Sequence, residues 1–165
     1  MKNLHLLQQS TYDVIDSPIG ELIIITSAKG LHAIVWDVDS KDLDRENLIR
    51  SKGEKIIVQT KKQLAEYFVG KRETFDLPLV LNGTPFQIQV WRQLQKIPYG
   101  ETISYGEQAK RIGDKNKARP VGMANGRNPI PVIIPCHRVI GSNGKLVGFG
   151  GGLSRKEWLL NHERK

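Results

Sequence analysis

Short runs of hydrophobic, mostly β-branched residues open the chain, and polar turn sequences separate them. The turns are Ser17-Pro18-Ile19-Gly20 and Ala28-Lys29-Gly30. Runs of this kind, joined by tight turns, are typical of an antiparallel meander. The predicted strands are Thr11–Ile15, Glu21–Thr26 and Leu31–Trp36.

Helical patterns follow the predicted strands. We predict one helix over Asp42–Arg50 and a second over Thr60–Val69. In the second helix, Thr60 and Gln63 have the spacing of a capping box, and Gly70 can end it. This part of the chain carries no catalytic constellation, and residues 1–80 are expected to form a small α/β domain.

A second domain is predicted to begin near residue 81, where the composition shifts after a short linker. Thr84 has the character of an N-cap, Pro85 occupies the first helical position, and Gln87 closes a capping box. Residues 81–165 are therefore expected to form a separate and mainly helical domain.

A helix-turn-helix pattern follows this helix. Ser104 and Glu107 have the spacing of another capping box, and Gly113 with Asp114 breaks the helix that they begin. Lys117–Asn125 is predicted to be a short third helix. Two short helices joined by a tight turn are typical of DNA-binding domains, although the same packing occurs in proteins that never touch DNA.

Three prolines then stiffen the chain. Pro129, Pro131 and Pro135 exclude a helix, so the segment that leads to Cys136 is predicted to be extended. Such a segment would hold the cysteine at a fixed place.

The C-terminal stretch is predicted to contain a hairpin and one helix. Val139–Ile140 and Leu146–Val147 flank an Asn-Gly pair, which suits a tight hairpin turn. The closing helix is predicted to start at Ser154, with Glu157 completing a capping box.

Charge divides unevenly between the two predicted domains. The whole chain carries a net charge of +8. Residues 1–83 hold 11 basic and 12 acidic side chains, whereas residues 84–165 hold 14 and 5. Lysine and arginine near phosphates release counterions, so a polyanion such as DNA is the simplest partner for the second domain. A solubilising surface charge is the alternative.

The basic residues gather on the predicted helix-turn-helix. Between Lys110 and Arg127 the chain has six of them and a single acid, Asp114. That is where a recognition helix would meet phosphates.

Composition also limits the location of the protein and the roles open to its cysteine. The chain has no apolar run of 18 residues and no signal-peptide core, so we expect a soluble, cytoplasmic protein. Its single cysteine, Cys136, excludes a disulfide within the chain and a multi-cysteine zinc site. Cys136 is therefore either an inert buried thiol or a reactive one.

The neighbours of Cys136 favour a reactive thiol. Pro135 precedes it, and His137 and Arg138 follow it. An electropositive, locked setting of this kind is typical of an exposed, nucleophilic thiolate. In an extended segment Cys136 and His137 would point to opposite sides, so adjacency does not guarantee a direct pair, and a water could bridge them. A buried, unreactive cysteine beside a surface histidine is the alternative.

Several longer motifs surround this cysteine and resemble the O6-alkylguanine-DNA alkyltransferase family. The resemblance covers residues 83–163, whereas the N-terminal part matches only in general character. The motifs are Gly83-Thr84-Pro85-Phe86-Gln87, Ile97-Pro98-Tyr99-Gly100, Ser104-Tyr105-Gly106, Arg127-Asn128-Pro129-Ile130-Pro131, Pro135-Cys136-His137-Arg138-Val139, Gly150-Gly151-Gly152-Leu153 and Trp158-Leu159-Leu160-Asn161-His162-Glu163.

The resemblance implies a two-domain α/β fold. The N-terminal domain would be ribonuclease H-like, with a small antiparallel sheet and helices. The C-terminal domain would be a mainly helical winged helix-turn-helix domain that also contains the reactive site.

The resemblance also implies catalytic roles. Cys136 would accept the alkyl group, His137 would activate it through a water, and Glu163 would orient the imidazole. Asn128 would fix the turn between the recognition helix and the cysteine, and Tyr105 would hydrogen-bond the departing guanine and crowd the phosphate.

Further implied roles concern DNA and the flipped base. Arg119 would enter the base stack, Ala118 and Gly122 would let the recognition helix lie close in the minor groove, and Ser142 would contact a phosphate. The residues that wall the base pocket would be Pro131, Val139 and Gly150.

The implied activity is a single, self-inactivating transfer from O6-alkylguanine, and also from O4-alkylthymine, in double-stranded DNA. The product is a thioether, so no turnover follows and no cofactor or metal is expected. We expect a monomer in solution, and cooperative binding along DNA stays open.

Four residues depart from the common family pattern: Pro120, the adjacent Asn125 and Gly126, and Gly150. They leave the substrate range open and suggest a pocket that admits alkyl groups larger than methyl.

Two rival functions remain at this point. A winged helix-turn-helix regulator with a structural cysteine would explain the charge and the fold. A thiol hydrolase would need turnover and a base positioned from a distant histidine, and the sequence contexts of His5 and His32 suggest neither. Alkyltransferase-like proteins that bind the lesion without repairing it lack the acceptor, so Cys136 argues against that class.

Overall fold

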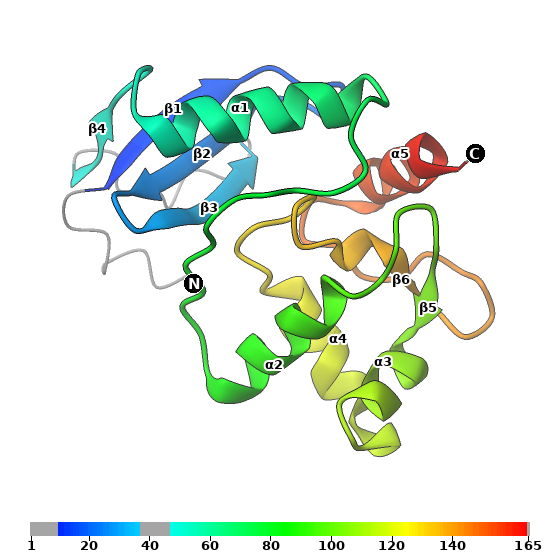
Figure 1. The fold of residues 1–165 in the computed structure, drawn as a ribbon. Helices are drawn as coiled ribbons and strands as arrows, with labels where there is room; N and C mark the ends of the chain where they lie inside the picture. Colours follow the sequence, from blue (N-terminus) through cyan, green and yellow to red (C-terminus); the bar gives the residue numbers. More distant parts are fainter. Residues whose placement is uncertain (1–9, 37–46, 165) are drawn as a thin grey trace. The chain divides into compact units, whose positions relative to one another are not determined.

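The structure is a computed structural model that describes residues 10–36 and 47–164. It contains two compact units, with the boundary between Asn82 and Gly83 (Figure 1). Each unit is described by itself. None of the helices among the described residues is long and apolar enough to cross a membrane.

The first unit is built on a four-stranded sheet with the order β3-β2-β1-β4. The central pairs β1–β2 and β2–β3 are antiparallel, as the turn chemistry predicted. The edge strand β4 pairs with β1 in parallel. The strands are β1 Thr11–Ile15, β2 Leu22–Ser27, β3 Gly30–Trp36 and β4 Ile49–Arg50.

Burial of β2 explains why the sheet is stable. Residues 22–26 are all buried, although successive side chains of a strand point to opposite faces. Both faces of the sheet are therefore covered. Helix α1, Lys55–Phe68, contacts β1, β2 and β3 and supplies the buried residues Ile57, Leu64 and Tyr67 (Figure 1).

Two helix predictions in this unit need correction. Residues 49–50 of the predicted helix Asp42–Arg50 form strand β4, because the Ile49 amide donates to the Ser10 carbonyl at the open edge of β1. Residues 42–46 lie outside the described residues. The second helix starts five residues earlier than predicted, at Lys55.

The cap of α1 is Glu54 rather than Thr60. The Glu54 carboxylate accepts the Ile57 amide at 3.0 Å. The buried Thr60 hydroxyl donates to the Ile56 carbonyl at 2.7 Å, one turn back within the helix. A threonine whose hydroxyl donates to a carbonyl one turn back lies inside the helix and does not mark where the helix starts.

The second unit begins with the predicted capping box. Thr84 Oγ1 accepts the Gln87 amide at 3.2 Å, and Gln87 Oε1 accepts the Thr84 amide at 2.9 Å. Helix α2, Pro85–Leu94, follows and buries Val90, Trp91 and Leu94.

The helix-turn-helix is also confirmed. Ser104 caps α3, Tyr105–Arg111, and Gly113 at φ 101° ends it. After a single 3-10 turn over Lys115–Lys117, helix α4 runs from Ala118 to Gly126, with Pro120 in its first turn. α2, α3 and α4 pack against one another (Figure 1).

The predicted hairpin and the last cap are wrong. β6, Val139–Ile140, pairs in parallel with β5, Ile103–Ser104, and not with Leu146–Val147. A tight turn does form at residues 141–145, where the Gly141 amide donates to the Lys145 carbonyl. Helix α5, Leu153–Glu163, starts one residue before Ser154 and has no side-chain cap.

We expect Glu54→Ala to lower the free energy of unfolding by about 1 kcal/mol, because the first turn of α1 loses its cap. Urea unfolding monitored by circular dichroism measures the change. Glu21→Ala removes an exposed carboxylate outside any helix and should leave the midpoint unchanged. Equal midpoints for both variants would show that Glu54 does not cap the helix.

Candidate active site around Cys136

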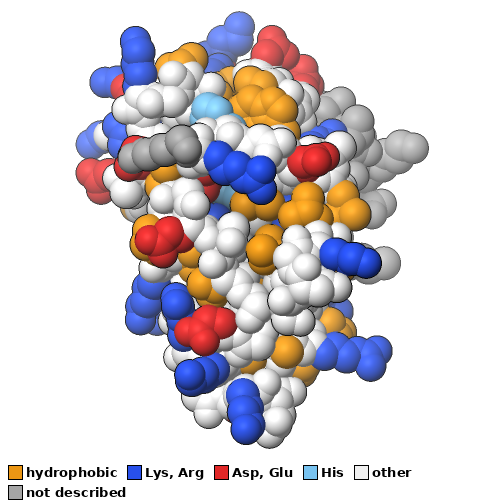
Figure 2. Space-filling model, turned by 90° about the vertical axis from the view of Figure 1, so that its right-hand side faces the viewer, with side chains coloured by type: hydrophobic (Ala, Val, Ile, Leu, Met, Phe, Trp, Pro, Cys, Tyr) orange, Lys and Arg blue, Asp and Glu red, His pale blue; other side chains and the backbone are white. Residues whose placement is uncertain are grey.

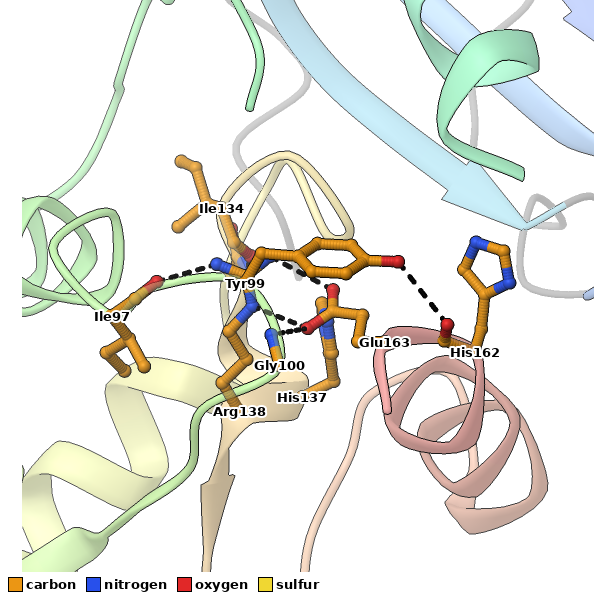
Figure 3. Close-up of polar contacts among 9 residues, drawn as sticks. Ile97, Tyr99, Gly100, Ile134, His137, Arg138, His162 and Glu163 are labelled. Carbon is orange, nitrogen blue, oxygen red and sulfur yellow. Dashed lines mark hydrogen bonds and ion pairs between the residues drawn. The ribbon is translucent and has the colours of Figure 1, made fainter. Parts of the chain in front are cut away.

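A buried carboxylate organises the residues that follow Cys136. Glu163 is the last residue of α5 and is 1 % exposed. Its Oε1 lies 2.7 Å from His137 Nε2, and its Oε2 accepts Arg138 Nε at 2.8 Å (Figure 3). The end of the last helix is thereby tied to the cysteine segment.

Arg138 completes what we call the Glu163 clamp, the set of hydrogen bonds that joins Glu163 to His137 and Arg138. A second guanidinium nitrogen donates to Glu163 Oε1 at 3.0 Å, and the third donates to the Ile97 carbonyl at 2.6 Å (Figure 3). Such a bidentate pair fixes the plane of the carboxylate. Burial opposes the charged form of Glu163, yet the hydrogen bonds from His137 and Arg138 outweigh burial and hold the pKa of this carboxyl well below its usual range. Glu163 is ionised.

The geometry determines the tautomer of His137. Because Glu163 is ionised and accepts, His137 Nε2 carries the hydrogen and Nδ1 is left as an acceptor. Burial lowers the pKa of His137, and the hydrogen bond to Glu163 offsets only part of that shift. The imidazole is therefore neutral at pH 7. Nδ1 is buried and makes no hydrogen bond to the described residues. It is the nitrogen available to take a proton.

Cys136 itself is more buried than the sequence predicted. It is 6 % exposed, whereas an exposed thiolate was expected. The segment is also not extended throughout, because Cys136–Arg138 forms a 3-10 turn. Successive side chains in such a turn diverge by about a third of a circle rather than half. Two nearby hydrophobic residues in the chain, Ile134 and Val139, are fully buried.

The turn before Cys136 is held by Asn128. Its side-chain nitrogen donates to the Ile134 carbonyl at 2.7 Å, and its oxygen accepts the Ile130 amide at 3.0 Å. Within this loop Val132 is at φ 74°, which is rare for a β-branched residue. A backbone in this region is strained and is kept there only by its surroundings.

Sequence reasoning missed Lys156. This α5 residue is fully buried, and its ammonium donates to the Val139 carbonyl at 2.6 Å and to the Val147 carbonyl at 3.0 Å. Burial lowers the pKa of Lys156, and the negative charge of the Cys136 thiolate opposes that shift. The ammonium therefore interacts electrostatically with Cys136 when that thiol is ionised. Lysine in a surface-type helix pattern gives no signal of such burial, so the sequence could not have indicated it.

Tyr105 lies beside this ammonium. Its hydroxyl donates to the Val147 carbonyl at 2.8 Å, and Lys156 Nζ lies 3.4 Å from the same hydroxyl. Burial and the Cys136 charge raise the pKa of Tyr105 to about 12, so the phenol keeps its proton. The predicted catalytic residues Cys136, His137 and Glu163 therefore share one region with Tyr105.

The residues expected to contact DNA lie mainly on α4. Arg119 is exposed, Ala118 and Gly122 are half-buried, and a Cβ at Gly122 would lie 3.5 Å from the Tyr105 ring. Ser142 is exposed in the turn after β6. Figure 2 shows basic side chains projecting from the lower part of the molecule, where α2, α3 and α4 lie.

The residues expected to wall the base pocket differ in exposure. Pro131 and Val139 are buried, whereas Gly150 is exposed. A Cβ at Gly150 would lie 3.3 Å from the Gly126 carbonyl at the end of α4. Among the residues that the structure describes, no three His, Cys, Asp or Glu side chains come together as a metal site.

Fold and site together define a class: a helix-turn-helix protein with a single cysteine directly before a histidine that forms a buried pair with a glutamate. Two family models match the chain, described as 6-O-methylguanine DNA methyltransferase, ribonuclease-like domain, over residues 10–81 and DNA binding domain over residues 85–165. The chain belongs to the 6-O-methylguanine DNA methyltransferase family, and its second unit binds DNA.

Known relatives agree with this assignment. The methylated-DNA–protein-cysteine methyltransferase of Methanosarcina barkeri is 48 % identical over 92 % of this chain and 96 % of its own length. That of Mycolicibacterium paratuberculosis is 46 % identical over 93 % and 92 %. The crystal structure of Mycobacterium tuberculosis OGT in complex with DNA has a TM-score of 0.86 and 46 % identity, covering 93 % of this chain and 92 % of that one.

Gly100 offers a test of the Glu163 clamp. It is at φ 78°, its amide lies 3.3 Å from Glu163 Oε2, and an added Cβ would lie 2.9 Å from the Glu163 backbone oxygen. We expect Gly100→Ala to displace Glu163, and thereby to slow alkylation of Cys136 by iodoacetamide about tenfold. Mass spectrometry of quenched samples gives the rate.

Gly144→Ala is the matched control. Gly144 has nearly the same φ, 77°, but nothing lies within 4 Å of the position of its Cβ. It should cost about 1 kcal/mol of stability through backbone strain alone and leave the alkylation rate unchanged. If both variants slowed alkylation equally, strain rather than the clamp would explain the effect.

Lys156→Met tests the electrostatic role of the Lys156 ammonium. Methionine keeps much of the side-chain volume but removes the ammonium, so the thiolate loses a stabilising charge. The pH at half-maximal alkylation should move upward, with a rate about tenfold lower at pH 7 for a shift of one pH unit and equal rates at high pH. Lys145→Met, at an exposed position, should not move the profile. A lower plateau with an unmoved midpoint would contradict the electrostatic role.

Proposed function

We propose that this chain repairs DNA by transferring the alkyl group of O6-alkylguanine, once per molecule, to Cys136. The observation that carries the proposal is the buried contact of 2.7 Å between His137 Nε2 and Glu163 Oε1, with His137 directly after the cysteine. The unit that contains this pair matches the DNA binding domain of the 6-O-methylguanine DNA methyltransferase family. The lesion chemistry is inferred from the relatives, which are methylated-DNA–protein-cysteine methyltransferases.

The proton path starts at the thiol. His137 Nδ1 takes the thiol proton through one water, while Nε2 keeps its hydrogen bond to Glu163. Arg138 keeps Glu163 ionised and in plane, and therefore acts as a positioning residue. The nucleophile, its base and the group that orients the base have the same relation in other covalent catalysts.

The transfer itself is an in-line displacement. The Cys136 thiolate forms a bond to the alkyl carbon, the bond from that carbon to guanine O6 breaks, and guanine leaves with the electron pair. Tyr105, whose phenol stays protonated, turns its hydroxyl from the Val147 carbonyl and donates a hydrogen bond to the departing base. The product is a thioether, which water does not hydrolyse under physiological conditions, so the protein acts once.

Access to the buried sulfur requires that the base leave the duplex. Flipping costs a few kcal/mol of stacking and pairing, on the order of what protein contacts can offset. Arg119, exposed on α4, fills the place of the flipped nucleotide, and Ser142 contacts a phosphate. Pro131, Val139 and the glycine loop with Gly150 receive the base.

Substrate range and assembly are part of the same proposal. O4-alkylthymine carries its alkyl group in a similar position and is a second substrate, and competition with O6-benzylguanine measures how large a group the site admits. Failure of O6-benzylguanine to inactivate at high concentration would count against an open site. The protein acts as a monomer.

Intact-protein mass spectrometry after incubation with an O6-methylguanine duplex tests the function. We expect a gain of one methylene group, located on the peptide that contains Cys136, and no gain for Cys136→Ala. His137→Phe should slow the transfer by about 10²-fold or more, because the thiol loses its base. A duplex that binds without any mass gain would instead support a DNA-binding regulator with a non-catalytic cysteine.

A further inference from the structure

The outer face of α4 carries an apolar side chain between two arginines. Met123 is 59 % exposed. Arg119, four residues before it, and Arg127, the C-cap residue four positions after it, are also exposed. Residues four apart share one face of a helix. We call Arg119, Met123 and Arg127 the α4 ridge. The opposite side of the helix is buried through Val121, Ala124 and Asn125.

Buried polar contacts fix the rotation of α4. Trp91 Nε1 donates to the Ala124 carbonyl at 2.9 Å. The Asn125 side chain exchanges two hydrogen bonds with Gln108 of α3, at 2.8 and 3.3 Å. Turning the helix to bury Met123 would break these bonds inside the unit, where unpaired polar groups are costly. Met123 is therefore held outward.

A single exposed methionine is unremarkable on most surfaces. Met123 differs because it lies between guanidinium groups on the recognition helix of a unit with a large basic excess. Phosphates complement the arginines, and an apolar side chain among them complements what lies between phosphates, namely base edges and stacked bases. Proteins that bend DNA insert side chains of this kind, methionine included, between base steps.

We propose that Met123 is a wedge that opens a base step next to the lesion, and that it makes repair depend on the neighbouring sequence. The inference rests on the proposed function. Four residues of helix rise by about 6 Å, while base pairs are about 3.4 Å apart. If Arg119 fills the place of the flipped nucleotide, Met123 reaches a step within about two base pairs of it.

The wedge gives a specific dependence on sequence. Pyrimidine–purine steps such as TA unstack easily, whereas A-tracts are stiff. Opening the neighbouring step therefore costs less when that step is TA. Transfer to Cys136 should be faster for O6-methylguanine beside a TA step than beside an AA step, and only a side chain that enters the step should produce this difference.

Single-turnover transfer on matched duplexes tests the proposal. The duplexes carry O6-methylguanine with a TA or an AA step within two base pairs, on either side of the lesion. We expect a rate ratio of about fivefold for the unaltered protein. Met123→Ala and Met123→Gln should reduce the ratio to about one, whereas Met123→Leu should keep it because leucine retains the apolar volume.

Two controls separate the possible causes. Val58→Ala removes a half-exposed apolar side chain from α1 and should keep the ratio. Reaction with free O6-benzylguanine needs no duplex and should be unchanged in Met123→Ala. The wedge is overturned if the unaltered protein shows no ratio, if Met123→Ala keeps it, or if Met123→Leu loses it. Absence of any transfer to Cys136 in the unaltered protein would instead refute the proposed function.

Discussion

The site depends on one buried negative charge. Glu163 is almost fully enclosed, and an isolated carboxylate in such a place would be strongly disfavoured. Here His137, Arg138 and the Gly100 amide supply donors to both of its oxygens. Breaking a buried pair by removing one partner costs about 3–5 kcal/mol, because the other charge stays behind unpaired. The clamp therefore holds the end of α5 and the cysteine turn in one arrangement.

This arrangement explains how a buried thiol can still react. Burial alone would favour the neutral form of Cys136, and a deep hydrocarbon setting would leave it inert. Two features oppose that outcome. The His137 imidazole is neutral and its Nδ1 makes no hydrogen bond to the described residues, so it can accept a proton. The Lys156 ammonium interacts electrostatically with the ionised sulfur. The same ammonium donates to the carbonyls of Val139 and Val147. One side chain therefore supplies the positive charge and holds these two backbone segments in place. Enclosure then excludes bulk water from the reaction.

Sequence reasoning succeeded where the signal was local. The Thr84 capping box and the Gly113 break are each contained in a few residues, and both are confirmed. It failed where partners are distant in the chain. β6 pairs with β5, which lies more than thirty residues earlier, so the Asn-Gly turn could not reveal the pairing. The Cys136–His137–Glu163 set was predicted only through motif resemblance, and Lys156, an ordinary helix lysine in sequence, was not predicted at all.

The DNA face and the reactive cysteine share one short, rigid segment. α4 is fixed from behind by Trp91 and by the Gln108–Asn125 pair, and only one residue separates its end from Asn128. Asn128 in turn fixes the loop that delivers Cys136 through hydrogen bonds at both ends of that loop. If α4 is the helix that seats on DNA, as proposed above, its position determines where the sulfur lies relative to the duplex. In the proposed single transfer the alkyl group stays on the sulfur, so the site does not have to regenerate a free thiol, and a fixed arrangement does not limit turnover.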